Sequence, residues 1–126
     1  MRKWSLLKNQ KGFSLVEVLI ALALLGIIGA AFIGGLATAS RSIYIADERA
    51  TAENLARSQM EYVKEQPYLV GGAYDIIDLS AYPASYSVSV TSNPLAGVPG
   101  GIQEITVTVS HHGSVKITLV DYKVNR

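Results

Sequence analysis

The stretch Lys11-Gly12-Phe13-Ser14-Leu15-Val16-Glu17, with the apolar run that follows it, decides how the chain is organised. A basic leader ends at Gly12, Phe13 opens a long hydrophobic segment, and Glu17 is the carboxylate near its start. No charged residue occurs from Val18 to Ser40, about 23 positions. At about 1.5 Å per residue they form roughly 35 Å of helix, enough to cross a bilayer. A carboxylate near the bilayer centre costs on the order of 2.5 kcal/mol or more, so Glu17 suggests a function.

Length and composition indicate one small domain beyond this segment. Of the 126 residues, 49% are hydrophobic. Four of the 11 Lys and Arg side chains precede Phe13, so the chain after Gly12 carries seven basic side chains against ten acidic ones. A mildly acidic chain without a basic patch argues against nucleic acid as a partner. The sequence has no cysteine, which excludes disulfides, cysteine zinc sites and thiol chemistry.

Two interpretations compete for the apolar segment. The first is a secretory signal peptide cut at Ala37-Thr38-Ala39, which would release a secreted domain after Ala39. The second is a retained membrane span whose basic leader lies in the cytoplasm, as the positive-inside rule predicts. The segment exceeds the ~7–15 residues of a signal core and contains Glu17, so the retained span is favoured. This predicts a single-pass protein of the cytoplasmic (inner) membrane with its head outside the cytoplasm.

The residues around Gly12 resemble the processing site of type IV prepilins, a family that includes the pseudopilins of type II secretion. The shared pattern is Gly-Phe-(Ser/Thr)-Leu-(Val/Ile)-Glu. The resemblance implies that a prepilin peptidase cuts between Gly12 and Phe13, and that Phe13 is then N-methylated. It further implies that the helix leaves the membrane lipid for the core of an extracellular or periplasmic filament. The implied partners are the peptidase, other pilin or pseudopilin subunits, and the assembly platform of the inner membrane.

Glu17, Gly26 and Gly34 are the assembly residues that this resemblance implies. In the family, the glutamate faces the terminal amine of a neighbouring subunit, and opposite charges attract strongly in low dielectric. Such a pair would set the axial register of assembly. The less favoured alternative is an interfacial acid that extends to the headgroups. Gly26 matches a glycine common in the family, whereas Gly34 stands where major pilins often carry a helix-breaking proline. The glycines either let the helix loosen in a filament or permit close helix packing in lipid.

The helical pattern continues past the membrane segment to Glu65 or Gln66, and Pro67 cannot continue it. This predicts one helix of about 53 residues from Phe13, roughly 80 Å long. An apolar stripe at i, i+3, i+4 spacing comprises Ala52, Leu55, Ala56, Gln59, Met60 and Val63. A face of alternating charges, interpreted as solvated, comprises Arg49, Glu53, Arg57 and Glu61. The segment 56–62 is similar to the equivalent helix of small minor pseudopilins and minor pilins.

Residues 67–126 predict a loop at 67–84, pinned by Ile76, Ile77 and Leu79, and three strands. Period-two alternation places the strands at about 85–92, 103–110 and 114–124, with a hairpin turn at His111-His112-Gly113. The expected fold is α+β, with a long N-terminal helix packed at its C-terminal half on a small three-stranded antiparallel sheet, the lollipop shape of pilins. The expected organisation is a leader at 1–12, a transmembrane and filament-core half at 13–40, and a head at 41–126 whose helix is 41–66.

The head's sequence suggests no enzyme, cofactor or metal site. His111 and His112 are adjacent, so in a strand they would point to opposite faces, and they are interpreted as turn histidines in water. Asp75 and Asp78 fall short of the ~6–8 oxygen ligands that calcium takes and are interpreted as solvated loop acids. Serine, histidine and aspartate all occur, but no spacing marks a catalytic triad.

The expected function is that of a structural subunit, processed after Gly12 and assembled through its hydrophobic helix into a type IV pilus-like filament or a type II secretion pseudopilus. The small head and the missing proline at Gly34 favour a minor pilin or minor pseudopilin. One alternative is a membrane-anchored adhesion or ligand-binding module that does not polymerise; another is a secreted domain released after Ala39. Cleavage after Gly12, no cleavage, and cleavage after Ala39 distinguish the three. Secretion, adhesion, motility and DNA uptake are all compatible with the sequence.

Overall fold

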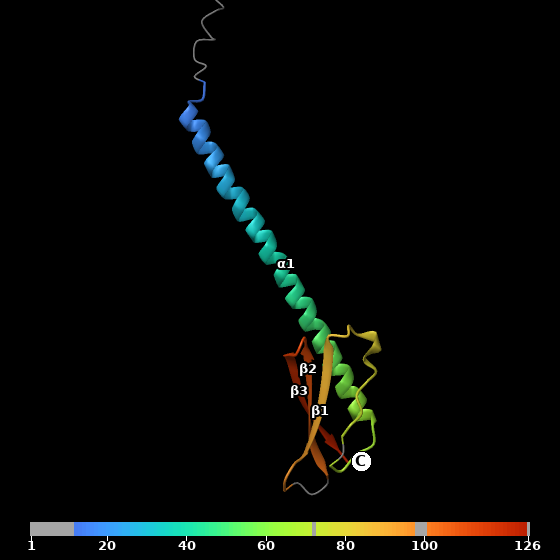
Figure 1. Ribbon diagram of the computed structural model, residues 1–126. Coiled ribbons are helices and arrows are strands. Elements are labelled where there is room, and N and C mark those ends of the chain that lie inside the picture. The colour runs from blue at the N-terminus through green and yellow to red at the C-terminus, as the bar shows by residue number, and fades with distance from the viewer. Residues whose placement is uncertain (1–11, 72, 98–100, 126) are drawn as a thin grey trace, which may run out of the picture. The chain divides into compact units, whose positions relative to one another are not determined.

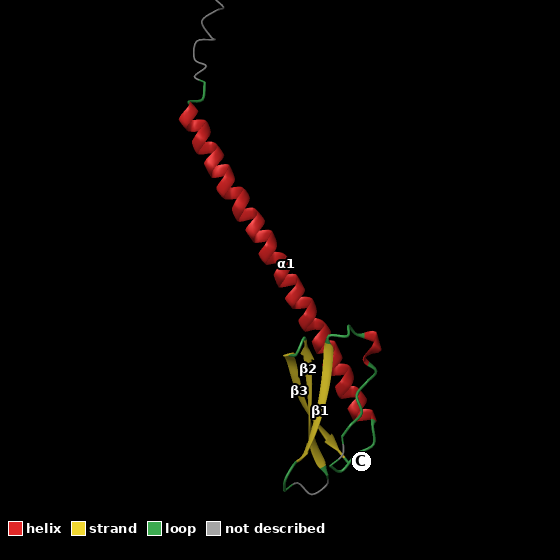
Figure 2. Ribbon diagram, viewed as in Figure 1, coloured by secondary structure: helices red, strands yellow, loops and turns green. Residues whose placement is uncertain are grey.

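The computed structural model describes residues 12–71, 73–97 and 101–125, which form one long helix, one short 3-10 helix and one three-stranded sheet (Figures 1 and 2). The chain divides into two compact units, one ending at Ser42 and one beginning at Ile43, and each is described by itself. The expected leader lies outside the described residues except for Gly12.

Helix α1 spans Leu15–Glu65. Its start is capped by Ser14, whose hydroxyl oxygen accepts a hydrogen bond from the backbone nitrogen of Glu17 at 3.2 Å. Ser14 and Glu17 have the spacing of a capping box, a signature of helix starts. At the other end, the backbone nitrogen of Gln66 donates to the carbonyl of Tyr62, after which the proline at position 67 ends the helix. The predicted long helix is therefore confirmed, and it begins two residues late because Ser14 occupies the cap.

Every described residue of the first unit, from Gly12 to Ser42, is exposed in the single chain, large aliphatic side chains included. The helix is long and apolar enough to cross a membrane, with a mean hydropathy of 2.6 in its most apolar window. Two of its hydroxyls bond within the helix: Thr38 donates to the carbonyl of Gly34 at 3.0 Å, and Ser42 donates to that of Thr38 at 3.1 Å. Exposed aliphatic surface costs about 25 cal/mol per Å² in water, so this unit suits lipid or other helices.

The second unit contains the sheet, in which β1 (Tyr86–Pro94), β2 (Ile102–His111) and β3 (Ser114–Val124) pair antiparallel in the order β1-β2-β3. The three predicted strands are confirmed; β1 and β2 are slightly longer than expected, and β3 has the expected bounds. The β2–β3 turn consists of His112 and Gly113, with φ values of 50° and 77°, between the paired residues His111 and Ser114. Two positive φ values match the right-handed twist of a two-residue hairpin.

The core of the second unit lies between the C-terminal part of α1 and one face of the sheet (Figure 2). The buried positions of α1 are the predicted stripe: Ala52, Leu55, Ala56, Gln59, Met60 and Val63. The sheet contributes alternate residues to this core: Tyr86, Val88, Ile105, Val107 and Val109. Period-two alternation thus buries one sheet face against one helix stripe, as predicted. On the charged face, Arg57 and Glu53 form an exposed ion pair of 2.7 Å.

The loop between α1 and β1 is held by buried amides as well as by part of the apolar contacts predicted. Gln59 donates to the carbonyl of Asp75 at 2.9 Å and accepts from the backbone nitrogen of Ile77 at 2.8 Å. Ile77 and Leu79 do pack against the core, but Ile76 is 46% exposed, so its expected anchoring role is wrong. Because loop backbone beside a core needs hydrogen-bond partners, a glutamine on the helix stripe serves where an aliphatic side chain would not.

Asp78, interpreted from the sequence as a solvated loop acid, is exposed but also has a local structural role. It caps the 3-10 helix η1 (Leu79–Ala81), and its carboxylate accepts from the backbone nitrogen of Ser80 at 2.9 Å. Hydrogen bonds from the Ser80 backbone and hydroxyl lower the pKa of Asp78. Its carboxylate is therefore occupied by local structure.

Candidate functional site

The start of α1 presents the predicted processing site in an open conformation. Gly12 and Phe13 precede the helix, both are exposed, and Phe13 is 82% exposed. A Cβ added at Gly12 would meet nothing within 4 Å. Packing among the described residues therefore does not require a glycine here.

Glu17 lies in the first turn of α1, where the helix dipole favours a negative charge. Its carboxylate makes no hydrogen bond or ion pair within the part of the chain that the structure describes. It lines a mostly apolar hollow along the helix, of about 370 Å³, together with Phe13, Val18, Ala21, Leu22 and Leu25. The structure thus brings Phe13 and Glu17 to one hollow and leaves the carboxylate available to a partner.

Gly26 and Gly34 lie on the exposed face of a continuous helix. An added Cβ at either position would meet nothing within 4 Å. No packing inside the chain requires these glycines, so any role for them concerns other molecules. Because α1 is unbroken through both positions in the single chain, local loosening within a filament stays a prediction.

Residues 7–33 match the family model described as the prokaryotic N-terminal methylation motif. The chain carries a prepilin-type N-terminal motif. The match spans the predicted cleavage point and continues along the apolar part of α1 to Ile33, and it is consistent with the type IV pilin and pseudopilin family. Comparison with curated proteins and with solved structures gave no match.

The prepilin-type motif and the apolar helix together support a pilin- or pseudopilin-like subunit. The motif implies processing by a prepilin peptidase and assembly with other pilin subunits. Both features fit a protein anchored in the inner membrane with its head on the far side. The expected resemblance to the prepilin family is confirmed at this level, and the roles of Gly12, Phe13, Glu17, Gly26 and Gly34 stay predictions.

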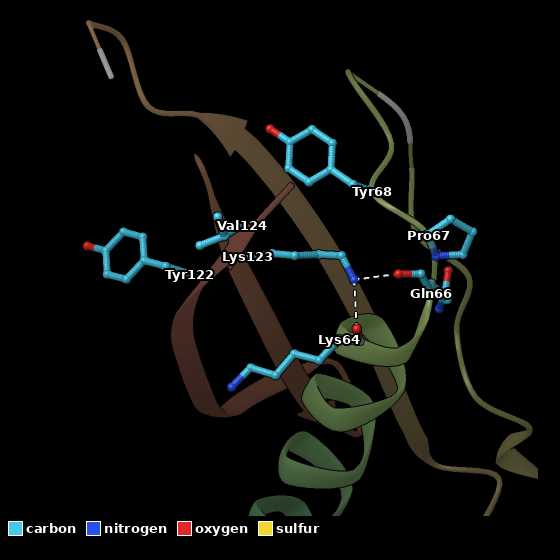
Figure 3. A pocket seen from close by; sticks show the side chains of 7 residues that line it. All are labelled: Lys64, Gln66, Pro67, Tyr68, Tyr122, Lys123 and Val124. Carbon is cyan, nitrogen blue, oxygen red and sulfur yellow. Dashed lines mark hydrogen bonds between the residues drawn. The ribbon is translucent and has the colours of Figure 1, made fainter. Parts of the chain in front are cut away.

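A lysine closes the C-terminal end of α1 in the head (Figure 3). The Nζ atom of Lys123 donates to the carbonyl oxygens of Val63, Lys64 and Gln66 at 2.6, 2.9 and 2.5 Å. The last carbonyls of a helix have no partner within it, and a cation there also complements the helix dipole. Lys123 is only 7% exposed, and this burial lowers the pKa of its ammonium group.

The hollow beside this lysine, of about 480 Å³, is lined by Lys64, Gln66, Pro67, Tyr68, Tyr122, Lys123 and Val124. Its two cations already have partners, because Lys123 holds the helix carbonyls and Lys64 pairs with the carboxylate of Asp121. The hydrogen bond from Lys64 lowers the pKa of Asp121. These contacts join helix, loop and strand, so we interpret the hollow as a structural joint.

His111 contradicts its interpretation as a turn histidine in water. It is the last residue of β2, is 6% exposed, and stacks on Tyr86 with ring centroids 4.2 Å apart. Only His112 is an exposed turn residue, and its ring centroid lies 4.1 Å from that of His111. The two rings are therefore neighbours rather than on opposite faces, because His112 leaves the strand with a positive φ.

The buried imidazole of His111 joins two residues that the sequence analysis missed. Its Nδ1 contacts the carboxylate of Glu48 on α1, and its Nε2 lies 2.7 Å from the hydroxyl of Ser85. Lys116 reaches the same Glu48 oxygen at 3.1 Å. Hydrogen bonds from His111 and then Lys116 lower the pKa of Glu48. Among the described residues, no group of three or more His, Asp or Glu side chains is arranged to hold a metal ion.

A break in the β2–β3 register accounts for the position of Lys116. Val109 pairs with Ile117, but Ser110 pairs with Val115, so Lys116 is an extra residue in β3. An extra residue reverses the alternation of side chains beyond it. Lys116 therefore reaches Glu48 on the helix side, whereas Val115 is exposed.

Proposed function

We propose that this protein is a minor pilin or minor pseudopilin, a structural subunit without enzymatic turnover. A prepilin peptidase cuts it between Gly12 and Phe13, and the new N-terminus at Phe13 is methylated. The subunit then leaves the inner membrane and joins a type IV pilus-like filament or a type II secretion pseudopilus. The observation that carries this proposal is the prepilin-type motif at the start of the exposed apolar part of α1, where Glu17 is the one carboxylate before Ser42 and is unpaired among the described residues.

Cleavage creates a positively charged amine, the kind of partner that the Glu17 carboxylate does not have among the described residues of the single chain. The new amine belongs to Phe13, four residues before Glu17, and both residues line the same apolar hollow. In a bundle of apolar helices an unpaired charge of either sign is strongly unfavourable. Pairing the amine of one subunit with the Glu17 carboxylate of its neighbour satisfies both charges and fixes the axial offset between subunits.

The described residues of the first unit, 12–42, are called the stem here, and the four glycines of its helical part support helix-to-helix packing. An added Cβ at Gly26, Gly29, Gly34 or Gly35 would meet nothing within 4 Å, although glycine costs about 1 kcal/mol relative to alanine in a helix. Small residues let neighbouring helices approach closely in lipid and in other apolar surroundings. Glycine in place of a helix-breaking proline at position 34, together with the small head, favours a minor subunit.

The test compares Glu17→Ala with Glu53→Ala, an exposed glutamate of the head that pairs only with Arg57 among the described residues. Both variants are made in cells that hold the peptidase and the filament machinery, and filament and membrane fractions are quantified. Breaking a buried charge pair costs about 3–5 kcal/mol. We therefore expect both variants to be cleaved normally and Glu17→Ala to fall at least about tenfold in the filament fraction. Normal incorporation of Glu17→Ala would remove the role assigned to Glu17.

A further inference from the structure

Three side chains from separate segments of the head form a hydrogen-bonded chain that the proposed assembly function does not use. Glu48 comes from α1, His111 ends β2, and Ser85 directly precedes β1. The carboxylate contacts Nδ1 of the imidazole, and the hydroxyl lies 2.7 Å from Nε2. The order carboxylate, imidazole, hydroxyl is that of a nucleophilic serine with its base and orienting acid.

The donor and acceptor roles in this chain follow from Glu48. An ionised carboxylate only accepts hydrogen bonds, and the lowered pKa of Glu48 keeps it ionised near neutral pH. Nδ1 of His111 must then carry the proton. In the neutral ring Nε2 has a free lone pair, which accepts the hydrogen bond of the Ser85 hydroxyl. This tautomer lets the imidazole take the serine proton.

The imidazole is held on several sides. It stacks on Tyr86, whose hydroxyl donates to the backbone carbonyl of Glu48 at 3.3 Å. Lys116, placed by the β3 bulge, binds the same carboxylate oxygen. The titratable groups around His111 are Tyr44, Asp47 and Glu48 of α1, Tyr86 of β1, Lys116 of β3 and the adjacent His112. A ring fixed in this way needs little rearrangement to act as a base.

Ser85, the serine of this hydrogen-bonded chain, lines an open hollow. Ser85 is partly exposed and lines a hollow of about 290 Å³ with Tyr44, Asp47, Pro83 and both histidines. That volume suits a small molecule. The acidic side chains of Asp47 and Glu48 disfavour an anionic group there, so a short, uncharged acyl group fits best.

We propose that Ser85 is an activated nucleophile that accepts a short, uncharged acyl group from an activated ester. Oγ of Ser85 forms a bond to the ester carbonyl carbon while its proton passes to Nε2 of His111. The bond from that carbon to the leaving oxygen then breaks, and the leaving alcohol takes the proton from Nε2. The products are O-acylated Ser85 and one alcohol, with no oxidant or cofactor consumed. Glu48 is the positioning residue.

The test uses p-nitrophenyl acetate and the purified full chain in a detergent that contains no ester. The release of p-nitrophenolate is timed, and the acetylated residue is found by peptide mass spectrometry. General base catalysis contributes about 10²–10⁴-fold. We expect one acetyl group on Ser85 and release at least about 100-fold faster than in Ser85→Ala. The matched control is Ser87→Ala, an exposed serine two residues along the chain, which should react like the wild type.

Variants of Glu48 test whether this residue positions His111 for the reaction or only supports the fold of the head. We expect Glu48→Gln, which has no carboxylate to accept the Nδ1 proton of His111, to release p-nitrophenolate more slowly than the wild type, and Glu48→Asp, which keeps a carboxylate, to recover part of the rate. Circular dichroism of each variant establishes that the head is folded. Equal release from folded Ser85→Ala and wild type, acetylation confined to lysines, or equal release from Glu48→Gln and Glu48→Asp would overturn the proposal.

Discussion

Replacing Lys123 by methionine removes the cation that closes the C-terminus of α1 while keeping much of the side chain's apolar volume. The lost ammonium serves the carbonyls of Val63, Lys64 and Gln66, at distances of 2.5 to 2.9 Å. Its Nζ also lies 5.4 Å from the ring centroid of Tyr74. The substitution therefore leaves three carbonyl oxygens near the core without this donor. Figure 3 shows two of these contacts, with Lys64 and Gln66.

The expected loss is about 2–3 kcal/mol in the free energy of unfolding of the head. A hydrogen bond to a charged group contributes about 1.5–3 kcal/mol, and a partly buried cation at a helix C-terminus up to about 2 kcal/mol. These contributions overlap because one ammonium makes all the contacts. Its desolvation, visible in the lowered pKa of Lys123, offsets part of them. The same loss lowers the melting temperature of a domain this small by roughly 10–20 °C.

Urea unfolding of the full chain in detergent, followed by the near-ultraviolet circular dichroism of tyrosine, measures this loss. All seven tyrosines lie after Ser42, so the signal reports the head and not the stem. Lys64→Met is the matched control, because Lys64 is half exposed and pairs with Asp121 at the surface. Such pairs contribute about 0–1 kcal/mol. A Lys123→Met variant no less stable than Lys64→Met would refute the reasoning.

Gly101 has a φ of +70°, and an added Cβ would lie 3.1 Å from the Cβ of Asn125 and 3.2 Å from the hydroxyl of Tyr68. We expect Gly101→Ala to lower the urea midpoint of the head clearly more than Gly97→Ala, which has a φ of +84° but open space around it. The pKa of Glu48 is lowered from 4.5 by its bonds to His111 and Lys116, so the unfolded chain binds more protons in acid. Its contribution to stability is thus present above pH 4.5 and lost as the pH falls through the lower folded pKa, and thermal melts of Glu48→Gln should show a shallower acid decline.

The sequence predicted the fold of the head well because its signals are periodic and local. The stripe from Ala52 to Val63 has the period of a helix face, and the alternation in the strands has the period of a half-buried sheet. Pro67 marks the end of α1 within two residues, since it cannot continue a helix. The prepilin-type motif was equally readable because it depends on consecutive residues.

The long-range contacts were beyond such reasoning. Glu48, Ser85 and His111 are far apart in the chain and meet only through the packing of α1 on the sheet and the pairing of β1 with β2. Neither spacing nor composition reveals that meeting. Two missed features did leave a signal. The Ser14–Glu17 spacing marks a capped helix start, and strand alternation places Lys123 on the same face as Leu119, where a lysine needs a special partner.

The central claim, that this is a prepilin-type subunit, is tested most directly by the N-terminal mass of the protein from membranes of cells that contain a prepilin peptidase. Peptide mass spectrometry of the N-terminal fragment identifies both the first residue and its modification. We predict a chain that begins at N-methylated Phe13. A chain that begins at Ser40 would instead show secretion of a free head, and a chain that keeps its N-terminus would show a plain membrane anchor. Either result would contradict the proposed assembly through α1.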